Sequence, residues 1–264
     1  MIDILYLSPH LDDVVLSCGG TLHRQSLQRK RVVILTVCAG EPPAGELSAF
    51  AQSLHVRWEA SAQQSAANMV ALRKEEDTQA SALLKAEAIY LDLQDCIYRR
   101  DRNASAAWMY ESDEAIFGDL HSGDAGHIQD IASRLEELEM GSQTQIVVPL
   151  AVGQHVDHQL IRLAAEQWAA QNDGKLQYYE DFPYAEREGR LNEVLQPADN
   201  WEPKLQVLDE ADLAARVAAI TLYTSQLSTF WPDTEAMRQA VHDYAWRRGS
   251  FDTLAERFWK IVRT

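Results

Sequence analysis

The chain has 264 residues, of which 46% are hydrophobic and 24% charged, a composition typical of a globular protein with a sizeable core and unlike that of a disordered chain. Its 40 acidic and 24 basic residues give a formal net charge of -16, which repels nucleic-acid phosphates and anionic lipid surfaces. We therefore expect neither nucleic acid nor a membrane as a partner.

The predicted elements alternate between strands and helices from the start of the chain. An apolar run ending at Leu7 is followed by a turn, by helix-like spacing over 12–30, and by a Val/Ile/Leu-rich run at 32–37 that is typical of a strand covered on both faces. An Ala-, Gln- and Glu-rich helix over 58–85 leads into a third strand at 89–93. This alternation predicts an α/β fold.

The second half of the chain continues the pattern after a long irregular loop over about 95–126, which contains three glycines. Next in chain order come a helix, a strand, a second helix and a second strand, at 127–140, 145–150, 157–171 and 176–180. The segment 184–210 is polar and predicted to lie over the surface, and the part from about 208 onward is predicted to be mainly helical. With no internal repeat and no break in composition, we expect a single domain over 1–264.

The three cysteines and the N-terminus indicate the compartment. No C-x-x-C pair occurs, so Cys18, Cys38 and Cys96 are predicted to be reduced core thiols. The first residues have no basic region followed by a cleavage site, and no stretch reaches the roughly 18 apolar residues of a membrane span. We predict a cytoplasmic protein.

Two segments carry the residue types that hydrolytic chemistry requires. Pro9-His10-Leu11-Asp12-Asp13 follows the first predicted strand, and His155-Val156-Asp157-His158 follows the strand that ends near Leu150. Ligands of open parallel sheets bind at the carboxyl ends of the strands, so these segments can meet at one site. A hydrolytic zinc site needs three ligands of His and Asp/Glu type and one open position.

Each segment also has a purely structural interpretation when it is taken alone. Asp12 and Asp13 are suitable as the N-cap and first-turn acid of the following helix, and a single His-x-x-His spacing is common by chance. The two segments together, each after a strand and before a helix, predict a metal site.

With these motifs the chain resembles the PIG-L/LmbE-like deacetylases, whose motifs are usually P-H-P-D-D and H-x-D-H. The resemblance implies a Rossmann-like three-layer αβα domain with a mainly parallel sheet. It also implies one Zn²⁺ per chain, or Fe²⁺ in the cell, held by His10, Asp13 and His158. Leu11 stands where the family usually has Pro, and Val14 where Glu is frequent; neither is a proposed ligand or base, so both concern the substrate subgroup.

The resemblance also implies catalytic roles for the remaining polar residues of the motifs. Asp12 would be the general base, and His155 would support the oxyanion and help the amine to leave. Asp157 would hold His155 in its charged form, because a neighbouring carboxylate raises the pKa of an imidazole.

Four further residues are candidates for substrate binding: Arg73, Asp95, Tyr179 and Asp181. The first two stand where family members line the substrate pocket, and the other two end a predicted strand on the side of the motifs. Arg73 and Glu76 are equally interpretable as an intrahelical ion pair. A strand tyrosine such as Tyr179 is more often part of the core.

We therefore predict a zinc-dependent hydrolase that removes the acetyl group from an N-acetylated amino sugar, such as an N-acetylglucosamine derivative, or from a sugar conjugate. One alternative is an amidase acting on a thiol-sugar conjugate or on a longer N-acyl glycoconjugate. A second is a non-catalytic sugar- or nucleotide-binding module, which is disfavoured because the chain has neither a G-x-G-x-x-G nor a P-loop motif. The individual substrate and the oligomeric state are left open.

Overall fold

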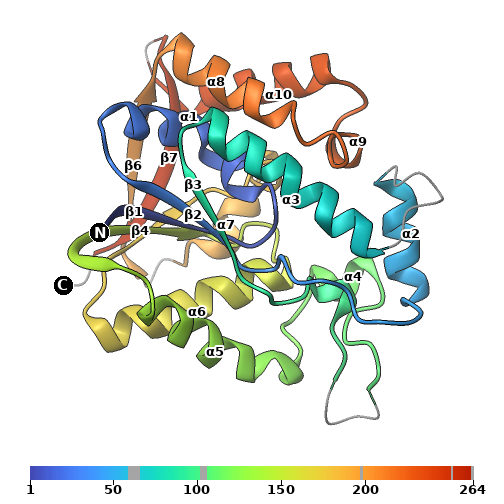
Figure 1. Ribbon diagram of the computed structural model, residues 1–264. Coiled ribbons are helices and arrows are strands. Elements are labelled where there is room, and N and C mark those ends of the chain that lie inside the picture. Colours follow the sequence, from blue (N-terminus) through green and yellow to red (C-terminus); the bar gives the residue numbers. More distant parts are fainter. Residues whose placement is uncertain (59–65, 102–105, 197–198, 251, 263–264) are drawn as a thin grey trace.

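The computed structural model describes the chain except for residues 59–65, 102–105, 197–198, 251 and 263–264. Its centre is a seven-stranded sheet with the order β3-β2-β1-β4-β5-β7-β6 (Figure 1). The first five strands pair in parallel, whereas β7 runs antiparallel to both β5 and β6. The strands are β1 Ile2–Ser8, β2 Val32–Thr36, β3 Glu87–Tyr90, β4 Met140–Pro149, β5 Leu176–Tyr179, β6 Trp201–Leu208 and β7 Leu254–Ile261.

Helices cover both faces of the sheet, which gives the predicted three layers. In Figure 1, α1, α3, α8 and α10 lie on one face, α5 and α6 on the other, and α2, α4 and α9 gather at one end. The helices are α1 Asp13–Leu27, α2 Ala49–Arg57, α3 Ala66–Leu83, α4 Asp113–Ile116, α5 Ala125–Glu136, α6 Val156–Asn172, α7 Arg190–Val194, α8 Glu210–Ile220, α9 Leu227–Phe230 and α10 Thr234–Arg248. Within the described residues, short 3-10 helices include η1 Cys96–Tyr98, η2 Ser122–Asp124 and η3 Tyr184–Glu186. None of the helices, within the described residues, is long and apolar enough to cross a bilayer.

The centre of the sheet forms the hydrophobic core, as the Val/Ile/Leu-rich runs predict. Every residue of β1 after Asp3 is buried, and so are all five residues of β2. In a strand with helices on both faces of the sheet, the side chains on either face are buried in the core, which explains the continuous apolar sequence. The predicted α/β class with a mainly parallel sheet is confirmed.

The C-terminal part contains strands besides the predicted polar surface segment and the mainly helical part that follows it. It contributes β6 and β7, which extend the sheet beyond β5 as an antiparallel pair. β6 is an edge strand with four successive exposed residues, and it includes Pro203, which a central strand does not tolerate. Because these positions face solvent, the sequence of β6 lacks the apolar pattern by which a strand is recognised. In the predicted helix 58–85, residues 59–65 lie outside the described part, and α3 begins at Ala66.

The helix α1, which begins in the first motif, is kinked where residues of the C-terminal part bind its backbone. Cys18 has non-helical angles (φ −146°, ψ 28°), and the Leu16 carbonyl accepts from Arg216 Nε at 3.0 Å. Glu256 accepts from the backbone N–H groups of Gly20 and Thr21 at 3.1 and 2.8 Å. A Cβ at Gly20 would lie 2.7 Å from a methyl carbon of the Leu208 side chain, so a larger residue here would displace Leu208.

Candidate active site

The structure brings the two motifs together at the carboxyl ends of neighbouring strands. His10 and Asp13 follow β1, whereas His155 and His158 begin α6 after β4, the strand paired with β1. Asp13 Oδ2 lies 3.1 Å from His10 Nδ1 and 3.4 Å from His158 Nε2. The ring centroids of His10 and His155 are 4.9 Å apart.

These donor atoms fit a metal ion. Ligand atoms about 2.0–2.2 Å from a tetrahedral metal lie about 3.3–3.5 Å from one another, close to the two distances from Asp13 Oδ2. His158 Nε2 is buried and has no hydrogen-bond partner among the described residues, which is costly unless another ligand completes it. Ligand atoms of His10, His155 and His158 also lie within 4.8 Å of one another. The cluster therefore supports a metal at this position.

Two carboxylates hold the outer nitrogens of the predicted metal-binding imidazoles. His10 Nε2 lies 2.9 Å from Asp157 Oδ2, and His158 Nδ1 lies 2.7 Å from Asp181 Oδ1. Such a partner fixes the tautomer and leaves the other ring nitrogen free for a metal. Asp181 is 1% exposed and also accepts from the backbone N–H of Val152 at 2.8 Å. It therefore supports His158 and does not reach the substrate side, contrary to its prediction as a substrate contact.

Asp157 contacts other groups than the prediction required. Its carboxylate accepts from Arg99 Nη1 at 2.5 Å and from the backbone N–H of Cys96 at 3.0 Å, besides its bond to His10. Its link to His155 runs from the Asp157 backbone N–H to His155 Nδ1, at 3.2 Å. Burial and the nearby His10 lower the pKa of His155, whereas the Asp157 charge raises it without outweighing them. The role of Asp157 toward His155 stays a prediction.

The two adjacent aspartates of the first motif have pKa values that are displaced in opposite directions. Burial and the Asp13 charge raise the pKa of Asp12 to about 7, against the lowering effect of Arg73 and His10. Burial also opposes ionisation of Asp13, but His158 and His10 outweigh it and lower the pKa of Asp13. Asp12 makes no capping hydrogen bond to α1, so its carboxylate is not needed for the helix. Such a divided pair is typical of a base beside a permanently ionised ligand.

A cavity of about 300 Å³ opens beside the motifs. Arg73 and Asp95, two of the four candidates for substrate binding, line it, and Arg73 Nη2 lies 3.7 Å from Asp12 Oδ2. The other wall is aromatic and comes from parts of the chain that the motifs do not reach: Trp58, Phe117, Tyr184 and Phe230. These residues do not belong to either motif, and their positions depend on the packing of α2, α4, η3 and α9.

Tyr179 is the second predicted substrate contact that the structure places elsewhere. Its side chain is 1% exposed, and its hydroxyl donates to the carbonyl of Leu7 at 3.1 Å. It therefore ties β5 to the end of β1 inside the core, as strand tyrosines more often do.

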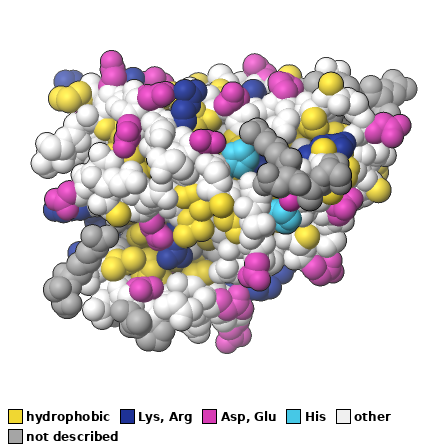
Figure 2. All heavy atoms as spheres, turned by 90° about the horizontal axis from the view of Figure 1, so that it is seen from below, with side chains coloured by type: hydrophobic (Ala, Val, Ile, Leu, Met, Phe, Trp, Pro, Cys, Tyr) yellow, Lys and Arg dark blue, Asp and Glu magenta, His cyan; other side chains and the backbone are white. Residues whose placement is uncertain are grey.

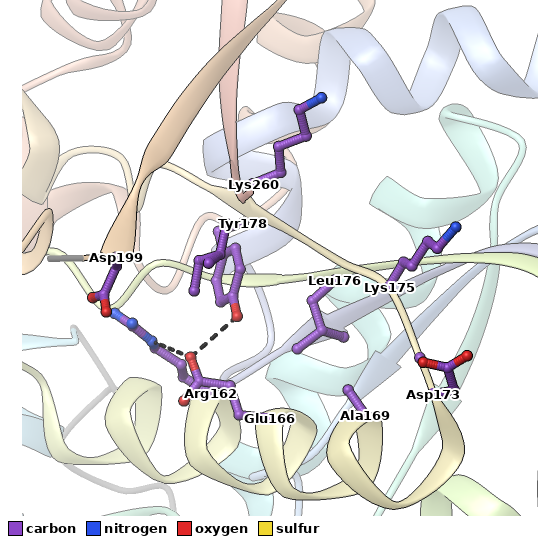
Figure 3. Close-up of a pocket in the computed structure, with 11 residues that line it drawn as sticks. Arg162, Glu166, Ala169, Asp173, Lys175, Leu176, Tyr178, Asp199 and Lys260 are labelled. Atoms are coloured by element: carbon purple, nitrogen blue, oxygen red, sulfur yellow. Dashed lines mark hydrogen bonds and ion pairs between the residues drawn. The ribbon is translucent and has the colours of Figure 1, made fainter. Parts of the chain in front are cut away.

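A larger cavity of about 550 Å³ lies between α6 and the strands β5 and β7 (Figure 3). Its wall carries an ion pair between Arg162 and Glu166 at 2.9 Å, and Tyr178 donates to Glu166 at 3.1 Å. None of the motif residues lines it. The molecular face seen from below carries many scattered acidic side chains, in line with the net charge (Figure 2).

Comparison with known proteins agrees with this geometry. The family model PIG-L, described as GlcNAc-PI de-N-acetylase, matches residues 5–169. A 2'-N-acetylparomamine deacetylase from Niallia circulans is 29% identical over 231 residues, which are 84% of this chain and 80% of the relative.

Solved structures with this fold include several deacetylases. A deacetylase of the teicoplanin biosynthesis pathway superposes with a TM-score of 0.83 at 24% identity, covering 99% of this chain and 98% of the other. A zinc-inhibited form of teicoplanin deacetylase gives 0.82 at 24% identity over the same shares. A deacetylase of an antimicrobial pseudoaglycone gives 0.77 at 26% identity, covering 99% and 97%.

Proposed function

This chain belongs to the PIG-L (GlcNAc-PI de-N-acetylase) family, and we propose on this premise that it is a zinc-dependent hydrolase that removes the acetyl group from an N-acetylated amino sugar or sugar conjugate. The observation that carries the proposal is the convergence of Asp13 on His10 Nδ1 and on the unpartnered, buried His158 Nε2. These two distances fit one metal ion.

The proposed ligands of a single zinc ion are His10, Asp13 and His158. When bound, such an ion polarises a carbonyl oxygen and makes water nucleophilic at neutral pH. The donor set of two imidazoles and one carboxylate is a usual one for catalytic zinc.

Asp12 is the proposed general base. Its carboxylate faces the cavity, and a pKa near 7 suits proton transfer at neutral pH. It takes one proton from the attacking water, whose oxygen adds to the acetyl carbonyl carbon. The same proton then passes to the amide nitrogen as the C–N bond breaks, which yields acetate and a free amine.

His155 is the proposed donor to the oxyanion that forms during this attack. Because His155 Nδ1 accepts a hydrogen bond from the Asp157 backbone N–H, the neutral ring carries its hydrogen on Nε2. A neutral imidazole can therefore donate to the developing charge without being protonated first. The contribution of one such donor in a dry site is about 3–4 kcal/mol.

The substrate class follows from the relatives and the cavity. The named relatives are deacetylases of 2'-N-acetylparomamine, of the teicoplanin pathway and of an antimicrobial pseudoaglycone, and the cavity combines an aromatic wall with charged groups. Aromatic faces pack on the apolar faces of sugar rings, and carboxylates accept from hydroxyls.

Acetate release from 2'-N-acetylparomamine, N-acetylglucosamine and N,N'-diacetylchitobiose, with a long-chain N-acyl glucosamine as comparison, tests this proposal. We expect acetate and a free amine from at least one acetylated sugar, and a kcat lowered by about 10²–10⁴-fold in the Asp12→Ala variant. Release of a fatty acid without any acetate would replace the proposed reaction with the longer-chain amidase. No hydrolysis of any of the four by protein carrying one zinc per chain would contradict it.

A further inference from the structure

We propose that Gln226 is a substrate-specificity residue whose side-chain carbonyl accepts a hydrogen bond from the sugar, and that Glu76 positions it through Ser225. The inference rests on the proposed function and names a further substrate contact for the same cavity. Gln226 lines this cavity together with Arg73 and Trp58, although it follows the first motif by more than 200 residues.

Glu76 binds the turn between α8 and α9 through both carboxylate oxygens. One oxygen accepts from the hydroxyl of Thr224 at 2.6 Å and from the backbone N–H of Ser225 at 2.9 Å, and the other accepts from the hydroxyl of Ser225 at 2.5 Å. The Glu76 side chain is 6% exposed. Next to it, Asp77 accepts from the hydroxyl of Tyr223 at 2.7 Å. The helix α3 thus fixes three successive residues that lead into α9, Tyr223 to Ser225.

These contacts give the R-x-x-E pattern of α3 a role other than an intrahelical ion pair. Arg73 points to Asp12 and lies over the ring of Trp58, with 5.1 Å to the ring centroid. Glu76, one turn later, binds Thr224 and Ser225, which precede Gln226. The same helix therefore contacts the proposed base and the turn that carries another residue lining the cavity.

The polarity of the hydrogen bonds fixes the orientation of the Gln226 amide. An ionised carboxylate only accepts, so the Ser225 hydroxyl must give its single hydrogen to Glu76. The Ser225 oxygen then has only lone pairs to offer, and it accepts from Gln226 Nε2 at 3.3 Å. The amide nitrogen is therefore turned toward Ser225, which leaves Gln226 Oε1 as an acceptor for a ligand. The matching ligand group is a donor, either a sugar hydroxyl or an ammonium group.

The first test compares Gln226→Leu with Gln226→Glu. Loss of one such hydrogen bond predicts a KM about ten-fold higher for Gln226→Leu, with kcat within about two-fold and an unchanged zinc content. Gln226→Glu keeps an acceptor and should restore most of the KM. If the donor of the substrate is an ammonium group, Gln226→Glu should lower the KM for 2'-N-acetylparomamine below the wild-type value. The KM for N-acetylglucosamine should not fall in this way. Gln79→Leu, on an exposed glutamine of α3 that bonds Glu75, is the matched control.

The second test asks whether Glu76 acts through Gln226. Glu76→Gln supplies an amide that can donate to the Ser225 hydroxyl. That hydroxyl can then donate to Gln226, so the orientation of the Gln226 amide is no longer fixed. We expect its KM to rise as in Gln226→Leu, and the double variant to be no worse than Gln226→Leu alone. Ser225→Ala tests the same connection with a smaller change if Glu76→Gln does not fold, as judged by thermal unfolding.

Calorimetric affinity for the same two sugars separates this inference from the proposed function. Absence of acetate release by the wild type would overturn the proposed function. Affinity and KM that stay unchanged in Gln226→Leu would overturn the role of Gln226. Effects of Glu76→Gln, or of Ser225→Ala in its place, that add fully to those of Gln226→Leu would overturn the positioning role.

Discussion

Two buried groups of charged side chains lie against α1, and they differ in whether the protein itself satisfies them. At the kink, Glu256 accepts from Gly20, Thr21 and Arg216, and Arg216 also donates to the Leu16 carbonyl. This structural pair is complete.

At the start of α1 the groups of the candidate active site are incomplete. Asp13 lies between His10 and His158, but His158 Nε2 has no hydrogen-bond partner in the described part of the chain. A buried polar group without a partner costs about 1–3 kcal/mol. This comparison separates a stabilising charge pair from a binding site. In the pair, other groups of the protein supply every hydrogen-bond partner described above, whereas in the binding site a ligand must supply one.

The largest expected effect comes from removing the base while leaving the ligands in place. Asp12→Ala should lower kcat by about 10²–10⁴-fold, because a positioned general base contributes about that much. Zinc content should stay near that of the wild type, since Asp12 is not among the proposed ligands. Turnover and metal analysis on the same preparation check this. Loss of zinc in parallel with activity would place Asp12 among the ligands.

The structural pair gives the complementary prediction, a loss of stability without loss of chemistry. Glu256→Gln leaves the buried Arg216 without its counter-charge, so the free energy of unfolding should fall by about 3–5 kcal/mol. The folded fraction should keep the wild-type zinc content and kcat. Denaturant unfolding measures the loss. The double variant Arg216→Met/Glu256→Gln should recover part of it, and a double variant that is less stable than Glu256→Gln would contradict the account.

The smallest expected effect is a shift in pH dependence. Arg73 lowers the pKa of Asp12, so Arg73→Gln should raise that pKa further above its ordinary value. Because the base must be ionised, the acidic limb of kcat/KM should move to higher pH, and Arg73→Lys should keep it closer to the wild type. A limb that stays in place in Arg73→Gln would mean that Asp12 does not set it.

The sequence predicted the candidate site better than its surroundings, for a physical reason. His10, Asp13 and His158 stand directly after strands of a parallel sheet, so their meeting at one edge follows from local order along the chain. The sequence does not reveal, however, which side chains at the end of a strand face a cavity. The structure places Tyr179 in the core and Asp181 against His158.

Other features depend on contacts between distant segments and were not predictable. β6 and β7 are recognisable only through their mutual pairing, because β6 is exposed at the sheet edge. Gln226 reaches the cavity because Glu76, 150 residues earlier, binds the turn before α9. Arg99 bridges Asp157 and Asp124, and no local pattern distinguishes it from a surface arginine.

The most direct test of the central claim is the zinc content per chain, measured by elemental analysis in the wild type, His158→Ala and Glu256→Gln. We expect one zinc per chain in the wild type and in the folded Glu256→Gln variant. We expect loss of zinc together with loss of acetate release in His158→Ala. A His158→Ala variant that folds, retains one zinc and still releases acetate at the wild-type rate would contradict the account.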